Sequence, residues 1–468
     1  MSTAAPIRRR GVPGAIVRHA AGGVARAGLD QAYEYAKSPF QLGGTSPAFL
    51  AFFCYIFVVT TLRIPIGTET MVIALLTLPM ERTKLQVPSV AIWTFVMVGW
   101  SFLGWSKTEY PDIVLVQMTE FAKVCLVMLV AVNVITTRSR LRMLLAGMMI
   151  FFATYPLRGT LVNYVLGETL NGRAIWNGTY ANPNDLAGFC VLQLSVALAV
   201  LEAEKTLWLR RAAIACAFLL PLVVILTASR GAFIALIVFV IVSAKRNWAI
   251  VKSKLWVVVL LGIVISYAGS DKIFARLGTI NVAVSGDAGA ADDEGSAQQR
   301  LEIWKVAEGI IAENWLTGVG IGAYNDAHFI MAQRQGYSPS AIGKRDTHST
   351  YLNVLAETGV IGFGFFMLLL GVTLKRSRLA RKEAGDASST LKAQLLWLEI
   401  GLYGFLVAGI WGTYGKLGPL YVHVAIVWCT AGLLQEQTAK VTRGGTPVRR
   451  IRGTSPPTAV PPLAGAGV

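Results

Sequence analysis

His348 is the residue of this chain whose type and position point most directly to chemistry. It lies where a long polar segment, roughly residues 270–349, returns to an apolar one, and that segment also contains Arg276 and Arg300. An imidazole titrates near neutral pH and can take a proton from a hydroxyl group. Arginine stays charged and binds phosphate oxygens through two parallel hydrogen bonds. These residues predict a group transfer with His348 as general base and Arg300 as its catalytic partner, holding an anionic leaving group.

Two more arginines lie in connections between apolar segments. Arg230 is in the turn T-A-S-R-G, and Arg173 is in G-R-A-I-W. An ionisable residue at membrane depth is a candidate functional residue. Each candidate also has an ordinary alternative: Arg230 can reach lipid phosphates, Arg276 and Arg300 can be interfacial surface charges, and His348 can make a structural hydrogen bond at a helix start.

The composition places these residues in a membrane protein. Hydrophobic residues make up 54% of the chain and charged residues 15%, and the mean hydropathy is +0.55, far from a soluble domain. A membrane span needs about 20 residues, and backbone in lipid must bond internally, which predicts about twelve transmembrane helices. The predicted spans are roughly residues 47–62, 64–80, 88–105, 113–135, 141–160, 185–203, 209–227, 228–244, 254–269, 350–374, 395–413 and 418–435.

The net charge of +17 is explained by topology rather than by nucleic acid. Most Lys and Arg residues lie in alternate connections and in both terminal tails, which the positive-inside rule assigns to the cytoplasm. The predicted divisions are a basic tail at 1–46, nine spans within 47–269, an outer loop at 270–349, three spans within 350–435 and a disordered tail at 436–468.

The outer loop between predicted helices 9 and 10 contains two recognisable stretches. From residue 298, apolar residues of Q-Q-R-L-E-I-W-K-V-A-E-G-I-I recur at helical spacing and predict an amphipathic helix. The following G-V-G-I-G lacks the preceding strand of a dinucleotide loop and instead predicts close approach to neighbouring backbone. Asp346, His348 and His328 share the loop, but no repeated carboxylate motif accompanies them, so we expect no metal.

Three smaller expectations concern polar residues in or beside the predicted spans. Glu357 is expected to make an internal hydrogen bond, and Glu120 with Lys123 to form a buried pair. In A-N-P-N-D, Asn184 or Asp185 is expected to cap the following helix. These roles are structural.

The ordered motifs carry a family resemblance. They are N-G-T-Y-A-N-P-N-D-L-A at 177–187, S-R-G at 229–231, an R-x-x-x-W helix from Arg300, G-V-G-I-G-A-Y-N at 318–325 and H-S-T-Y-L-N-V-L-A-E-T-G-V-I-G at 348–362. This series resembles the O-antigen ligase and polysaccharide polymerase superfamily of bacterial inner-membrane glycosyltransferases. One departure is Ser349, where the family commonly has Asn.

The resemblance implies a fold and a reaction. The fold is an all-α, GT-C-like bundle in the bacterial inner membrane with its active site facing the periplasm. The reaction transfers a glycan from undecaprenyl diphosphate to a hydroxyl of lipid A–core, of another glycan or of a protein, without cofactor or metal. Arg173, Arg230, Arg276 and Arg300 would bind the diphosphate, and His348 would activate the acceptor.

Other functions compete with this interpretation. A ligase is slightly favoured over a polymerase or a protein O-oligosaccharyltransferase, which share the motifs. A twelve-helix transporter fits the helix count, but such proteins usually show two related halves, and none is visible. A scaffold protein would not require the ordered Arg and His series.

Overall fold

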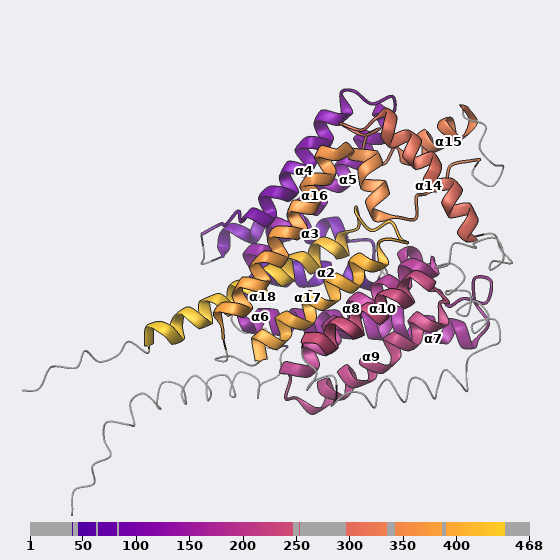
Figure 1. Ribbon diagram of the computed structural model, residues 1–468. Coiled ribbons are helices and arrows are strands. Elements are labelled where there is room, and N and C mark those ends of the chain that lie inside the picture. The colour runs from indigo at the N-terminus through magenta and orange to yellow at the C-terminus, as the bar shows by residue number, and fades with distance from the viewer. Residues whose placement is uncertain are drawn as a thin grey trace, which may run out of the picture.

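The computed structural model describes residues 40, 45–61, 64–81, 84–246, 252, 296–334, 342–385 and 390–444. Over these ranges the chain forms helices and connections, with an isolated β-bridge between Leu170 and Arg173, so the all-α prediction is confirmed. The helices, labelled in Figure 1, are α2 Pro47–Thr61, α3 Gly67–Thr77, η1 Leu78–Met80, α4 Ser89–Trp105, α5 Pro111–Val134, α6 Arg138–Phe152, η2 Ala153–Leu157, α7 Arg158–Val165, η3 Gly178–Tyr180, α8 Pro183–Ala203, α9 Leu207–Leu226, α10 Arg230–Arg246, α14 Ser296–Glu313, α15 Tyr324–Arg334, α16 Thr350–Glu383, α17 Thr390–Ala408 and α18 Gly418–Gly444.

Seven helical segments in the described ranges are long and apolar enough to cross a membrane. They are α5, the continuous α6–α7 unit, α8, α9, α16, α17 and α18, and α2, α3 with η1, and α4 are shorter apolar helices. Every predicted span falls on a helix except 254–269, which lies outside the described residues. The chain is therefore an all-α membrane protein, whereas the count of twelve spans and their sidedness stay predictions.

Helix α8 is the centre of the bundle. It packs against α9 and α17, and further against α6 and α10, and its apolar stretch is almost entirely buried. Gly401 of α17 allows the closest approach, because a Cβ at that position would lie 2.0 Å from the Ser195 hydroxyl of α8. Small residues let membrane helices pack backbone to backbone, where lipid provides no hydrophobic drive for association.

Ion pairs join the helix ends that the sequence assigns to the cytoplasm. Arg142 at the start of α6 makes two hydrogen bonds, of 2.8 and 2.7 Å, to Glu204 after α8. Glu399 of α17 is fully buried and accepts from Arg246 of α10 at 2.8 Å and from Arg381 of α16 at 2.7 Å. Buried carboxylates need such partners, since an unpaired charge is costly away from water.

Helices α14 and α15 lie together at the opposite end from the one where α18 leaves the bundle (Figure 1). They form within the predicted outer loop, and α14 confirms the amphipathic helix expected there. Its buried residues Ile303, Val306, Ala307 and Ile310 recur at helical spacing.

The Gly-rich stretch after α14 packs directly on a break in α16. Gly359 has φ 63° and ψ −176°, so the helix is interrupted there. The Val319 and Gly320 amides donate to the carbonyls of Ala356 and Glu357 at 2.9 and 3.0 Å, and the Val360 amide donates to Trp315. A Cβ on Gly359 would meet the Leu316 carbonyl oxygen at 2.2 Å. The prediction of close backbone approach is thus confirmed.

The structural expectations for individual polar residues have mixed outcomes. Glu357 is buried and bonds to Asn353 and to Lys416, at 3.2 and 2.7 Å, which confirms its internal hydrogen bond. The Glu120–Lys123 pair forms at 2.6 Å but is about half exposed, so its predicted burial is wrong. The two residues lie three apart on the outer face of α5, where the long side chains reach outward together. The cap of α8 is Asn182, whose side chain accepts from the Asn184 amide.

Candidate active site

His348 lies in a strained backbone conformation immediately before α16. Its φ is 47°, in the left-handed region that non-glycine residues seldom occupy. Such strain costs on the order of 1–3 kcal/mol and persists where the surroundings hold it. Here Thr347 closes a tight local turn: its hydroxyl donates to the Ser349 carbonyl at 2.9 Å and accepts from the Ser349 amide at 3.2 Å.

A carboxylate stands behind the imidazole. The Asp346 Oδ2 lies 3.7 Å from His348 Nδ1, and each side chain is 36% exposed. The same oxygen accepts a hydrogen bond of 2.7 Å from the Thr413 hydroxyl, which comes from the connection between α17 and α18. Asp346 therefore faces Nδ1, and Nε2 lies on the other side of the ring.

Helix α14 brings Arg300 to this site. Trp304 donates its indole N–H to the Thr347 carbonyl at 2.8 Å, directly beside His348. Arg300 lies four residues earlier on the same face of the helix. It is partly exposed, and its positive charge is one of the influences on the His348 ring. The R-x-x-x-W motif thus does two things: the tryptophan fixes the histidine loop, and the arginine faces the site.

The α17–α18 connection fixes the start of α16 from the other side. The Thr350 hydroxyl donates to the Gly412 carbonyl at 2.6 Å and accepts from the Tyr414 amide at 2.8 Å. The Thr350 amide donates to the Gly409 carbonyl at 2.8 Å. Because the first turn of a helix has unpaired N–H groups, these bonds anchor α16 where the histidine enters it.

Arg173 and the start of α8 border the candidate site on another side. Arg173 donates to Asn184 Oδ1 at 2.7 Å and to the Thr227 carbonyl at 2.8 Å. Tyr414 donates its hydroxyl to the Asn184 carbonyl at 3.1 Å. Asp185, the next residue, is within electrostatic range of Asp346. The N-P-N-D motif is therefore linked to the histidine loop through Tyr414.

Arg230 opens α10, three residues after the Thr227 carbonyl that Arg173 holds. It is partly exposed, and the adjacent Gly231 packs against Trp411, since a Cβ there would lie 2.8 Å from that side chain. Arg230 thus enters the bundle beside the same α17–α18 connection that holds Thr350. Arg276 lies outside the described residues.

Tertiary structure therefore assembles His348, Arg300, Arg230 and Arg173 around one connection. Sequence reasoning did not assign roles to Asp346, Thr413 or Tyr414. Asp346, two residues before His348, was the available signal, because an acid so near an imidazole is a natural orienting partner. In the sequence, the α17–α18 connection shows only the Gly- and Thr-containing break W-G-T-Y-G between two predicted spans, which gives no signal for a role in the site.

The electrostatics favour a neutral imidazole. Burial lowers the pKa of His348 below its usual 6.5, Asp346 opposes this, and Arg300 and Arg345 lower the pKa further. Near neutral pH the ring is then unprotonated and able to accept a proton.

The second histidine of this region, His328, is buried in α15, with Nδ1 3.1 Å from the Gly343 carbonyl oxygen. In the part of the chain that the structure describes, no group of three or more His, Cys, Asp or Glu side chains is arranged to hold a metal ion.

Part of the chain matches a known protein family. Residues 215–367 match the family model described as O-antigen ligase, and this segment contains Arg230, Arg300 and His348. No curated protein matches the chain. The family implies a glycosyltransferase-like reaction between a lipid-linked glycan and an acceptor, in the biosynthesis of surface polysaccharides. The match confirms the resemblance to the O-antigen ligase superfamily over residues 215–367.

Proposed function

We propose that this protein transfers a glycan from undecaprenyl diphosphate to an acceptor hydroxyl on the periplasmic face of the bacterial inner membrane, as an O-antigen ligase does. The observation that carries the proposal is the convergence on His348 of a carboxylate behind the ring and an arginine beside it. One group can take a proton while another holds negative charge, which is what transfer from a lipid diphosphate to a hydroxyl requires.

In the proposed reaction, His348 Nε2 takes the proton of the acceptor hydroxyl. The acceptor oxygen forms a bond to the anomeric carbon of the glycan, and the bond from that carbon to the diphosphate oxygen breaks. The electron pair leaves with undecaprenyl diphosphate, and His348 then releases its proton to water. Asp346 lies 3.7 Å from the opposite ring nitrogen, where it stabilises the imidazolium that forms.

The arginines hold the charge that moves onto the diphosphate. Arg300, whose charge acts on the His348 ring, is proposed as the principal clamp, together with Arg230 at the start of α10 and Arg276 in the predicted outer loop. Cations placed where charge develops contribute the largest share of such catalysis. Arg173 donates to Asn184 and Thr227. We therefore assign it chiefly to positioning the turn that precedes Arg230, beside the diphosphate.

The glycan profile of a strain that lacks this protein tests the proposal. Full-length polymer stranded on undecaprenyl diphosphate, with uncapped acceptor, is expected for a ligase. Single repeat units without long chains would assign a polymerase, and an unchanged surface polysaccharide with altered glycoproteins would assign a protein O-oligosaccharyltransferase. If the deletion strain shows none of these three outcomes, the proposed transferase activity is refuted.

The same strain can be complemented with His348→Ala. The proposal expects normal amounts of protein in the membrane and no transfer. Lys305→Ala provides the matched control, because Lys305 is an exposed cation on the same helix α14 and pairs with Glu302 one turn away. Glycan transfer by His348→Ala at the wild-type rate would rule out His348 as the general base.

A further inference from the structure

A cavity lies at the far end of α14 from Arg300. Its volume is about 240 Å³, and its walls come from the α4–α5 connection, the end of α14, the Gly-rich stretch and α15. The residues that matter here are Thr108, Glu109, Tyr110, Glu313, Asn314 and Arg334. None of them belongs to the site around His348. The distance along α14 from Arg300 to this cavity is roughly 15–20 Å at the rise of an α-helix.

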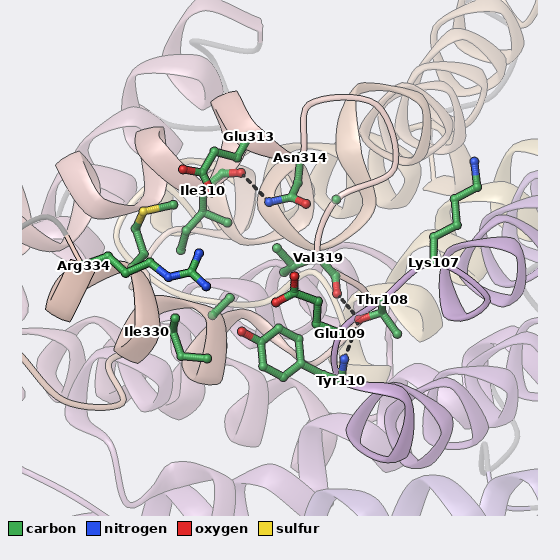
Figure 2. A pocket seen from close by; sticks show the side chains of 13 residues that line it. Lys107, Thr108, Glu109, Tyr110, Ile310, Glu313, Asn314, Val319, Ile330 and Arg334 are labelled. Carbon is green, nitrogen blue, oxygen red and sulfur yellow. Dashed lines mark hydrogen bonds between the residues drawn. The ribbon is translucent and has the colours of Figure 1, made fainter.

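The walls of the cavity are held together by defined bonds. The Thr108 hydroxyl donates to the Val319 carbonyl at 2.5 Å and accepts from the Tyr110 amide at 3.1 Å. The first bond joins the α4–α5 connection to the Gly-rich stretch, and the second fixes the connection itself, as Figure 2 shows. Gly320, with φ 103°, passes so close to α5 that a Cβ would lie 2.5 Å from Val114. The cavity is therefore built on backbone contacts that need glycine, which gives a preformed site.

The polar groups that face the cavity suit uncharged hydroxyl groups. Figure 2 shows Glu109, Tyr110 and Arg334 pointing toward one another across the cavity, whereas Lys107 points away from it. Carboxylates accept hydrogen bonds and a guanidinium donates them, so both halves of a sugar hydroxyl find a partner. Asn314 uses one amide N–H on the Ile310 carbonyl at 3.2 Å and keeps its carbonyl oxygen as a further acceptor.

The balance of charge argues against a phosphate group here. The cavity is lined by two carboxylates, Glu109 and Glu313, and by two cations, Arg334 and Lys107, of which Lys107 points away from it (Figure 2). The acids and the guanidinium offset one another, so neither a phosphate nor a simple cation meets charge of one sign, whereas a neutral hydroxyl can bond to both kinds of group. Partial burial, Glu109 and Asp326 raise the pKa of Tyr110 above its usual 10, so its phenol stays protonated and can donate. Its ring also offers an apolar face of the kind that stacks on a sugar ring.

We propose that this cavity is a saccharide subsite, which binds a neutral sugar residue of the glycan at a distance from the reacting end. Its volume lies below the roughly 300–1,000 Å³ of drug-sized sites, so it accommodates a single ring rather than a whole chain. The inference rests on the proposed function for the identity of the glycan. Binding at a remote residue would position the chain and leave the chemistry at His348 unchanged.

Binding of short oligosaccharides tests the subsite without catalysis. The probe is a mixture released by mild acid from the cell's own surface polysaccharide, added to the full-length protein in detergent, with affinity measured by saturation-transfer NMR and thermophoresis. Glu109→Gln and Tyr110→Phe each remove one hydrogen-bonding function while keeping the shape of the side chain. Each is expected to weaken binding by about tenfold or more.

Two controls keep the subsite separate from the proposed reaction. Lys107 lies in the cavity wall, but its side chain points away from the cavity (Figure 2), so Lys107→Ala should leave binding unchanged. His348→Ala should abolish transfer yet bind the oligosaccharides like the wild type. Wild-type affinity in both Glu109→Gln and Tyr110→Phe would overturn the subsite, whatever the outcome for transfer. Loss of binding in these two variants together with full transfer by His348→Ala would retain the subsite and refute the general base.

Discussion

Asp346→Asn is the substitution that most directly tests how the histidine works. In the proposed reaction His348 becomes positively charged as it takes the acceptor proton, and the Asp346 carboxylate 3.7 Å away stabilises that charge. The amide of asparagine keeps the size of the side chain and its hydrogen bond from Thr413 but removes the negative charge. The change therefore isolates the electrostatic contribution.

The magnitude follows from the separation and the exposure. Two unit charges 3.7 Å apart interact by about 1 kcal/mol in water and about 4.5 kcal/mol at an effective dielectric constant of about 20. Since each side chain is 36% exposed, solvent screening restricts the interaction to the lower part of that range, about 1–2.5 kcal/mol. At about 1.36 kcal/mol per factor of ten, kcat should fall by about 5- to 70-fold.

The pH dependence gives a second, independent readout. Only the neutral imidazole can accept the proton, so activity should fall as pH drops through the pKa of His348, which lies below 6.5 in the folded protein. Asp346 raises that pKa, so its removal should lower the pKa and move the acid limb of the rate profile to lower pH. Asp346→Asn should thus be slower at neutral pH while keeping its residual activity further into acid.

The assay is transfer of labelled glycan by purified protein in liposomes, measured across a pH series. Glu308→Gln provides the matched control, because Glu308 is an exposed acid of the same outer region and loses the same charge without facing His348. A wild-type rate and an unshifted acid limb in Asp346→Asn would refute the role of the carboxylate. A shift toward higher pH would show that another group sets the profile.

Three further predictions concern the clamp and the scaffold. Arg300→Ala should abolish glycan transfer while the protein reaches the membrane in normal amounts. Arg300→Lys should recover only part of the rate, since lysine lacks the planar guanidinium that bonds phosphate bidentately. Full activity of Arg300→Ala in the same transfer assay would exclude Arg300 as the diphosphate clamp. Gly359→Ala should lower stability by at least about 2–3 kcal/mol, because alanine tolerates neither this backbone conformation nor the Leu316 carbonyl 2.2 Å from its Cβ. Gly371→Ala, which meets nothing within 4 Å, is its control in thermal unfolding, and equal melting of the two would contradict the argument. Arg142→Ala should lower the unfolding free energy by about 3 kcal/mol, because the buried Glu204 loses its counter-charge and keeps only its bonds from the Lys205 and Thr206 amides. Glu120→Gln, in a half-exposed pair, should change the unfolding free energy by less than about 1 kcal/mol.

The positions of the helices were predictable because a membrane allows few alternatives. An apolar run of sufficient length must bond its backbone internally, so predicted spans and observed helices agree wherever the structure describes both. The sequence signals for helix caps and helix ends predicted the helix boundaries less well. Asn182 caps α8 in place of Asn184 or Asp185, and α16 continues to Glu383, well past its apolar stretch. Helix ends depend on side-chain bonds of single residues, which hydropathy does not detect.

The sequence alone determined the class of protein and the amphipathic helix of the predicted outer loop, and it singled out His348, Arg300, Arg230 and Arg173 as candidate site residues, because composition, periodicity and ordered motifs are local properties of the chain. Only the tertiary structure decided what surrounds them. Trp304 reaches Thr347, Thr413 reaches Asp346, and Tyr414 reaches Asn184, across separations of 43, 67 and 230 residues. No local pattern encodes such contacts. They exist because helix packing brings the α17–α18 connection, the start of α8 and the end of the outer loop together at one end of the bundle.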